Sequence, residues 1–189
     1  MVNQKMRFCD ILFSILILII FAPIILLISL LIFAFNGTPI IFKQSRIGYK
    51  GKEFSILKFR TMGNKMLKND KLRLTFFGRI LRKTSLDELP QFINVLNKDM
   101  SIVGPRPLPR NIEEKIKSSH KIKRRKILPG ITGMSQINYT GKKRKLSEKI
   151  NLDIEFVDNY TLYNYIQIIL RTPTVLIIRL FKNRSSIIK

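Results

Sequence analysis

The longest apolar stretch of the chain lies close to its first residues. It runs from Ile11 to Phe35, is interrupted by Ser14, Pro23 and Ser29, and carries no charge. At about 1.5 Å per residue, a helix of this length could cross a hydrocarbon core of roughly 30 Å. Pro23 near the middle removes a helical hydrogen bond, so the pattern predicts a bent or broken helix.

Two topologies for this helix remain open from the residues alone. The helix either crosses a membrane once with a kink, since proline is common in spanning helices, or breaks at Pro23 and returns to the same face. Cations flank both ends (Lys5 and Arg7 before the run, residues 43–50 after it), and the positive-inside rule favours keeping both flanks inside. A signal peptide is not expected, because no small-residue cleavage site follows.

Beyond a turn at residues 36–39, the pattern predicts a small sheet and several helices. Short strands over 40–42 and 54–59 flank two glycines, which is typical of a hairpin. Helices are expected over 71–81, 87–96 and 146–163, with a solvated helix over 113–126, a tight turn over 129–133 and a basic loop over 141–145. The expected fold class is α/β, mainly helical with a small β-hairpin, divided into an anchor (1–36) and a compact domain (37–189).

Two segments combine apolar and basic residues in a way that suits a membrane surface. They are residues 71–81 and residues 160–181, the second of which we expect to break at Thr172 and Pro173. Amphipathic helices of this kind lie at the headgroup layer with their cations reaching outward. Ordinary core packing explains the same pattern, and both interpretations stay open.

The charge balance narrows the class of protein. Lys and Arg number 35 against 12 Asp and Glu, giving a net charge of +23, yet 46% of the 189 residues are hydrophobic. This combination indicates a membrane-associated protein facing an anionic surface, or a nucleic-acid binder. The single cysteine, Cys9, permits no intrachain disulfide.

Adjacent carboxylates are scarce in so basic a chain, and one pair stands between a basic and an apolar segment. Asp87 and Glu88 follow Arg82 and precede the apolar residues of the 87–96 helix. One interpretation is a capping box, with Thr84 or Ser85 as the N-cap. The other is a nucleophile, because a carboxylate among cations stays ionised and can attack phosphorus.

A second candidate is Arg106, which stands between Pro105 and Pro107. Two prolines hold the backbone extended, and a rigidly presented guanidinium suits bidentate phosphate binding or stacking on a base. A plain proline-rich linker is the alternative. Lys58 on the second predicted strand and Arg60 directly after it are either anion contacts or ordinary surface charges.

Five motifs in a fixed order carry a family resemblance. They are a proline-broken apolar segment, Lys58-Phe59-Arg60-Thr61-Met62, Ser85-Leu86-Asp87-Glu88-Leu89-Pro90-Gln91, Asp99-Met100-Ser101-Ile102-Val103-Gly104-Pro105-Arg106-Pro107 and Pro129-Gly130-Ile131-Thr132-Gly133. The chain resembles the bacterial sugar transferases, and among them the small monotopic phosphoglycosyl transferases that initiate glycoconjugate assembly. The resemblance covers nearly the whole chain.

The resemblance implies a reaction and a location. Such enzymes move a sugar 1-phosphate from a UDP-sugar to polyprenyl phosphate, with UMP released, at the cytoplasmic face of the bacterial inner membrane. By this resemblance Asp87 is the nucleophile of a ping-pong mechanism and a ligand of Mg²⁺, which favours oxygen ligands. Glu88 is its acid/base or positioning partner, and the break at Pro23 becomes a re-entrant membrane helix.

The resemblance also implies binding residues and partners. Arg82 and the Pro105-Arg106-Pro107 element are expected to contact phosphate or uridine. Further substrate contacts are expected from Lys58, Arg60, Lys142 and Asp153. A homodimer and downstream glycosyltransferases are the expected protein partners, and no nucleic acid is expected.

The chain departs from the family pattern at several positions. Met134 stands where tryptophan is frequent, Phe156 where tyrosine is frequent, and Ala22 where serine is frequent. Lys142 replaces an arginine and supplies a point charge without a planar fork. These departures affect sugar and nucleotide contacts. Two other functions remain in competition: a non-catalytic subunit that recruits glycosyltransferases, and a membrane-tethered binder of nucleic acid or anionic lipid.

Overall fold

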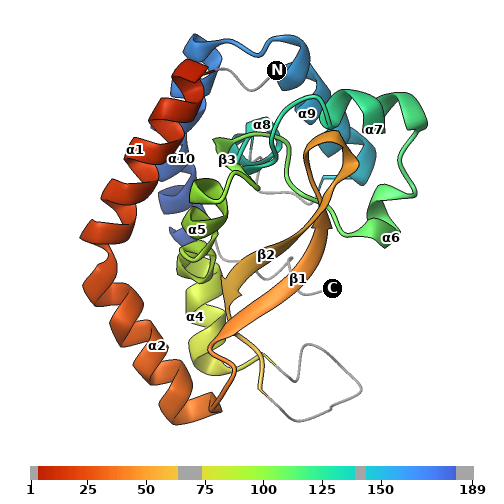
Figure 1. Ribbon diagram of the computed structural model, residues 1–189. Coiled ribbons are helices and arrows are strands. Elements are labelled where there is room, and N and C mark those ends of the chain that lie inside the picture. The colour runs from red at the N-terminus through yellow and green to blue at the C-terminus, as the bar shows by residue number, and fades with distance from the viewer. Residues whose placement is uncertain (1–3, 64–73, 139–143, 182–189) are drawn as a thin grey trace.

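The computed structural model describes residues 4–63, 74–138 and 144–181 (Figure 1). Its described part is mainly helical with two small sheets, which confirms the expected α/β class. The helices are α1 (Gln4–Ile20), α2 (Ala22–Asn36), α4 (Phe76–Thr84), α5 (Gln91–Leu96), α6 (Arg110–Glu113), α7 (Ser118–Arg124), α8 (Met134–Ile137), α9 (Leu146–Asp158) and α10 (Leu162–Phe181). The strands are β1 (Ile41–Ile47), β2 (Glu53–Phe59), β3 (Ser101–Val103) and β4 (Gly130–Thr132).

The apolar stretch forms two helices along one edge of the molecule (Figure 1). The break falls at Phe21, Pro23 lies in the first turn of α2, and the axes of α1 and α2 are bent by 62°. Within the described ranges no single helix is long and apolar enough to cross a membrane. The two helices of the bent pair, taken together, have the length and the apolar composition to do so. The predicted break is therefore confirmed.

The first sheet is the expected hairpin, but its strands are longer than predicted. β1 and β2 pair antiparallel from Ile41 opposite Phe59 to Ile47 opposite Glu53. The sequence pattern ended the first strand at residue 42, because the polar run that follows shows no alternation. Backbone pairing with β2 carries the strand to Ile47, and this extension brings Arg46 next to the site described below.

The second sheet replaces a predicted turn. Residues 129–133 were expected to turn tightly, and this is wrong, since β4 pairs in parallel with β3. The two backbones approach closely because glycines meet there: a Cβ added at Gly130 would lie 2.0 Å from the nitrogen of Gly104. A parallel pair between distant segments leaves no local signal in the sequence.

Three helix predictions also need correction. The 87–96 helix is divided into a single 3-10 turn (Leu86–Glu88) and α5, because Pro90 can stand only where a helix begins. Of the predicted 113–126 helix the structure forms only α7, because α6 already ends at Glu113, and the segment is not fully solvated, because Glu113 and Arg124 are buried. The 146–163 helix ends at Asp158.

The last apolar segment forms one helix rather than two. α10 continues through Pro173, where we expected a break. The hydroxyl of Thr172 donates to the carbonyl of Ile168 at 2.7 Å, one turn earlier. Of the 71–81 helix, residues 71–73 lie outside the described residues, and the described part begins at Phe76, capped by the Thr75 hydroxyl, which accepts from the Gly78 amide at 2.9 Å.

The core joins the bent apolar pair to the rest of the chain. Met6 of α1 is packed with residues of β2, β3, α5, α9 and α10, and Tyr165 of α10 is fully buried in the same cluster. A second cluster places Ile28 and Ile32 of α2 against Phe59 and Leu81. Both arms therefore pack on the same globular body.

Candidate active site

The two adjacent carboxylates lie on a short turn between two helices. α4 ends at Thr84, and the left-handed backbone of the next residue, Ser85 (φ 60°), redirects the chain into the 3-10 turn that contains Asp87 and Glu88. Asp87 is 7% exposed. The capping-box interpretation is wrong: the Thr84 hydroxyl accepts from the Leu86 amide, only two residues on, at 3.4 Å, the Ser85 side chain caps no amide, and the Glu88 carboxylate turns toward cations instead.

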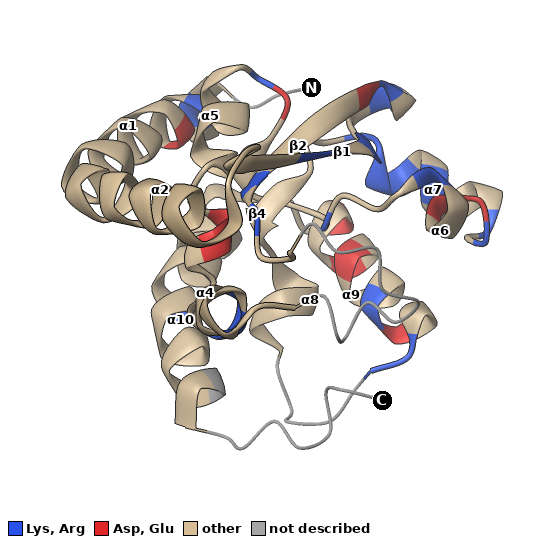
Figure 2. Cartoon of the chain, turned by 90° about the horizontal axis from the view of Figure 1, so that it is seen from below, with Lys and Arg blue, Asp and Glu red and all other residues tan. Residues whose placement is uncertain are grey.

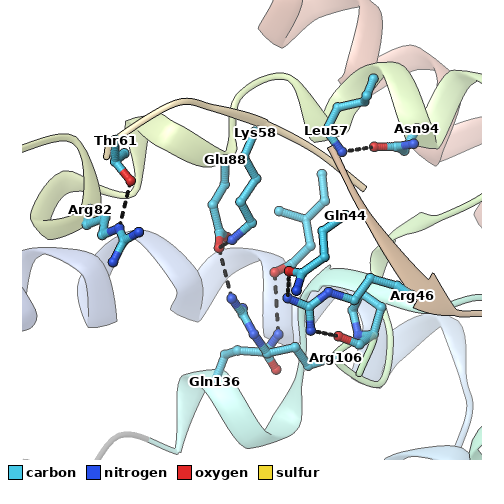
Figure 3. A network of polar contacts seen from close by, with 12 residues as sticks. Gln44, Arg46, Leu57, Lys58, Thr61, Arg82, Glu88, Asn94, Arg106 and Gln136 are labelled. Carbon is cyan, nitrogen blue, oxygen red and sulfur yellow. Dashed lines mark hydrogen bonds and ion pairs between the residues drawn. The ribbon is translucent and has the colours of Figure 1, made fainter. Parts of the chain in front are cut away.

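Glu88 brings together three segments that are distant in the sequence. Its Oε1 accepts hydrogen bonds from Lys58 Nζ at 2.6 Å and from Arg106 Nη2 at 2.9 Å (Figure 3). Lys58 comes from β2, and Arg106 comes from the loop after β3. The structure thus places Lys58, Glu88 and Arg106, all predicted from the sequence, in one cluster.

The pKa values of the two carboxyl groups are shifted in opposite directions. Burial is the main cause that raises the pKa of Asp87 to about 6, and the negative charge of Glu88 adds to it. The cations Lys58, Arg82 and Arg106 counteract this rise. Burial alone would also raise the pKa of Glu88, but Arg106 and Lys58 outweigh it and lower that pKa to about 2. At neutral pH the site holds two carboxylates, one firmly ionised and one easily neutralised.

Asp87 is the less engaged of the two. Among the described residues, none donates a hydrogen bond to its carboxylate or forms an ion pair with it. Arg82, in the last turn of α4, lies close enough to lower its pKa, while Arg82 Nε donates to the Thr61 hydroxyl at 2.9 Å. An ionised carboxylate near cations but without a partner is available to react or to bind a metal ion.

Sequence reasoning missed Arg46 as a site residue. Its Nη2 donates to Gln44 Oε1 at 2.6 Å and its Nη1 to the Pro107 carbonyl at 3.4 Å, so the guanidinium lies beside the Arg106 loop (Figure 3). Burial and the positive charge of Arg106 lower the pKa of Arg46. No local pattern separates Arg46 from an ordinary strand cation, because its importance depends on the pairing of β1 with β2.

These cations exceed the charge that they neutralise. Lys58, Arg46 and Arg106 lie around the one carboxylate of Glu88, and Arg82 lies near Asp87. Partly desolvated cations in excess attract an anion with several negative oxygens. The arrangement suits a phosphate or diphosphate placed against Asp87.

Comparison with known proteins identifies the family. Residues 2–179 match the family described as bacterial sugar transferase. The chain belongs to the bacterial sugar transferase family. Its motifs around Asp87 and Arg106 lie within the matched region, so the cluster described above is part of a bacterial sugar transferase.

Three relatives show the range of this similarity. The chain is 38% identical over 178 residues to the UDP-glucose:undecaprenyl-phosphate glucose-1-phosphate transferase of Escherichia coli, covering 86% of the chain and 38% of that relative. It is 34% identical to a protein of the same name from Caulobacter vibrioides, covering 93% and 71%. It is 32% identical to the UDP-N-acetylgalactosamine-undecaprenyl-phosphate N-acetylgalactosaminephosphotransferase of Aeromonas hydrophila, covering 88% and 42%. The chain thus spans less than half the length of two of these relatives.

Several predicted site residues of this bacterial sugar transferase lie elsewhere. The Arg60 guanidinium donates to the carbonyls of Asn36, Gly37 and Thr38 at the end of α2, so these contacts tie β2 to the apolar pair. Asp153 is buried behind the Arg106 loop, where it accepts from Arg124 at 3.2 Å. The substrate roles of both residues stay predictions, and Lys142 lies outside the described residues.

The residues fit a magnesium ion that is held partly by the substrate. No group of three or more His, Cys, Asp or Glu side chains comes together in the described part of the chain. Mg²⁺ commonly takes one or two carboxylates and completes its shell with substrate phosphates and water. Asp87 can supply such a carboxylate, whereas Oε1 of Glu88 is already bound by two cations.

Proposed function

We propose that this bacterial sugar transferase moves a sugar 1-phosphate from a UDP-sugar to undecaprenyl phosphate and releases UMP. Two relatives are named for the transfer of glucose 1-phosphate, and a third for the transfer of N-acetylgalactosamine phosphate. The observation that carries the proposal is the pair of Asp87 and Glu88, surrounded by more cations than it neutralises. Such a site suits a dianionic diphosphate and a carboxylate nucleophile.

The proposed mechanism has two displacements at phosphorus. A carboxylate oxygen of Asp87 attacks the phosphorus that carries the sugar, a new P–O bond forms, and UMP leaves with the electrons of the broken P–O bond. A phosphate oxygen of the lipid then attacks the same phosphorus and releases Asp87. The covalent intermediate lets one site serve a soluble donor and a lipid acceptor in turn.

Each neighbour has a proposed role in this chemistry. Lys58 and Arg106 hold Glu88 ionised, so Glu88 can orient them toward the donor, whereas its pKa of about 2 makes it a weak proton acceptor. Arg106, presented by Pro105 and Pro107, contacts a phosphate, and Arg46 is a second guanidinium for the same group. A Mg²⁺ ion bound at Asp87 would neutralise part of the diphosphate charge.

We also propose that residues 1–36 form a re-entrant anchor and residues 37–189 the catalytic domain at the cytoplasmic face of the inner membrane. Large apolar side chains on α1 and α2 are exposed, including Ile20 at 67% and Leu26 at 62%. In Figure 2 most of the α1 and α2 ribbon carries no colour of a charged residue, while Lys and Arg positions gather on α7. A continuous run of exposed apolar side chains along two helices suits contact with lipid.

The ends of the bent pair support re-entry rather than crossing. Arg7 near the start of α1 donates to the Val95 carbonyl at 2.7 Å, and Arg60 donates to the Thr38 carbonyl at 2.8 Å just after α2. Both ends are thus held by one globular body. A span would place these ends on opposite sides of the membrane.

The test is UMP release by membrane-embedded protein with Mg²⁺, undecaprenyl phosphate and a panel of UDP-sugars. We expect release with wild-type protein and none with Asp87→Asn. The matched control is Asp158→Asn, since Asp158 is half exposed and pairs with Lys123 on the surface. Asp87→Asn should remain membrane-bound and at least as stable at pH 7, because it removes a buried charge whose pKa is raised to about 6.

Two results would contradict the proposal. Undiminished UMP release by Asp87→Asn would remove the phospho-aspartate. Absence of release with every donor, from folded wild-type protein, would favour the subunit that only recruits glycosyltransferases.

A further inference from the structure

Behind the Arg106 loop lies a cluster of three charged side chains that solvent hardly reaches. The side chains of Arg124, Glu113 and Asp153 are 5%, 4% and 3% exposed. They come from α7, α6 and α9, three elements that lie on the side of the domain away from α1 and α2 (Figure 1). Within the described part of the chain, their side-chain hydrogen bonds go to one another, to the Arg106 loop, to Arg125 and to Ser135, and none goes to Asp87 or Glu88, so the mechanism above leaves them without a role.

Arg124 is the centre of this cluster. Its Nη1 donates to Glu113 Oε2 at 3.0 Å, and its Nε donates to Asp153 Oδ2 at 3.2 Å. Its Nη2 donates to the backbone carbonyl of Arg106 at 2.7 Å. Two carboxylates therefore fix the plane of the guanidinium, and the remaining nitrogen holds the loop.

The loop needs such partners. Two of its residues are prolines, which keep the segment out of a regular helix or sheet, so its carbonyls need donors from other parts of the chain. Three consecutive carbonyls are each bound: Pro105 by the Gly130 amide at 3.0 Å, Arg106 by Arg124, and Pro107 by Arg46. Of these three donors, Arg124 binds the residue whose side chain reaches Glu88.

We propose that Arg124 is a positioning residue, which, held by Glu113 and Asp153, fixes the backbone of Arg106 so that its guanidinium meets Glu88 and the donor phosphate. This inference rests on the proposed function, because it gives Arg106 a substrate to bind. The cluster is a poor device for stability alone, since buried ion pairs are often replaced by apolar residues without loss. It is a good device for orientation, because a planar guanidinium with three fixed partners has little freedom.

The chain contains a matched control. Arg125, the next residue, pairs with the other oxygen of Glu113 at 3.2 Å and is 33% exposed. The hydrogen bond of its side chain goes to Glu113 and not to the Arg106 loop. Arg125→Gln therefore removes an ion pair to the same carboxylate and leaves the Arg106 carbonyl bound.

The experiment compares kcat/KM for the UDP-sugar in Arg124→Gln and Arg125→Gln, with thermal unfolding of each. A displacement of about 1 Å at a positioned group can cost roughly 100-fold in rate, so we expect a loss of about that size for Arg124→Gln. We expect less than about a 3-fold loss for Arg125→Gln, since nothing moves at Arg106. Arg124→Lys keeps the buried charge but cannot bind three acceptors in a plane, and should recover little of the lost activity.

A double-mutant cycle separates positioning from general damage. In an Arg106→Ala background, Arg124→Gln should cost almost nothing further, because the side chain that it positions is gone. An equal loss in both backgrounds, or equal losses for Arg124→Gln and Arg125→Gln, would overturn the inference. If Arg124→Gln does not fold, the same cycle with Arg124→Lys decides. If wild-type protein releases no UMP, the proposed function fails and this inference fails with it. If wild-type protein is active but the cycle shows no coupling, only this inference fails.

Discussion

At the scale of single residues, the site depends on two neighbouring carboxyl groups whose pKa values are shifted in opposite directions. Glu88 is ionised because two cations bind it. The pKa of Asp87 is raised to about 6 because Asp87 is buried beside that negative charge. An identical pair on an exposed helix would titrate together. The difference is therefore made by the strands and loops that bring Lys58 and Arg106 to Glu88 and leave Asp87 less engaged.

The pH dependence of the reaction follows from this difference. An Asp87 nucleophile must be ionised, so kcat/KM should fall as the pH drops below about 6. In Glu88→Gln the neighbouring negative charge is lost, and Lys58 and Arg106 then favour the Asp87 anion. The acid limb of the residual activity should therefore move to lower pH, which a profile of UMP release from about pH 5 to 8 measures. An unchanged or upward-shifted limb would show that another group controls it.

At the scale of elements, the short parallel pair β3–β4 decides where Arg106 points. Gly104 follows β3 and Gly130 begins β4, and their backbones touch without side chains between them. The Gly130 amide in turn binds the Pro105 carbonyl at 3.0 Å. Glycine is required here by close approach rather than by backbone conformation, since Gly104 and Gly130 are not among the residues with positive φ.

Gly130→Ala tests this close approach. Its Cβ would lie 2.0 Å from the Gly104 nitrogen and 2.4 Å from the Thr132 carbonyl oxygen, so the strands must separate. We expect a loss of about 3 kcal/mol in the free energy of unfolding, measured by denaturant titration, with weaker UDP-sugar binding. The control is Gly37→Ala, where no atom lies within 4 Å of the added Cβ and only the positive φ of 67° costs stability, about 1 kcal/mol. A Gly130→Ala protein as stable as this control would contradict the expectation.

At the scale of the whole molecule, the bent apolar pair and the candidate catalytic residues form one structure. Arg60 binds the end of α2, and Lys58, two residues earlier on β2, binds Glu88. Arg7 binds the carbonyls at the end of α5, which follows the Asp87 turn. The proposed anchor and the proposed site therefore share β2 and α5.

Topology can be measured with single cysteines in a Cys9→Ser background. We expect Gln4→Cys and Lys43→Cys, both at exposed positions, to react equally with an impermeant maleimide from the cytoplasmic side of sealed vesicles. Pro23→Ala restores the missing helical hydrogen bond and should move a fraction of molecules to a spanning form, in which the thiol introduced by Gln4→Cys becomes protected. Opposite accessibility in the wild-type background would show a span, and equal accessibility in Pro23→Ala would show that proline does not determine the topology.

The sequence by itself determined those features that depend on neighbouring residues. Proline inside an apolar helix bends or breaks it because the missing amide hydrogen is local, and paired glycines between strands favour a hairpin. The carboxylate pair and the proline-flanked Arg106 were also evident, because their chemistry is unusual in so basic a chain. Their expected roles came from the resemblance of five ordered motifs rather than from periodicity.

Only the tertiary structure decided which of these residues meet. The parallel pairing of β3 with β4, the extension of β1 to Arg46 and the burial of Arg124 depend on contacts between distant segments, which leave no periodic signal. For the same reason Arg60 and Asp153 matched family positions, yet Arg60 binds the end of α2, and Asp153 is bonded to Arg124 and Ser135 and reaches Arg106 only through its charge. A charged residue looks the same in a sequence whether it binds substrate, a helix end or another charge, because its environment is made by the fold.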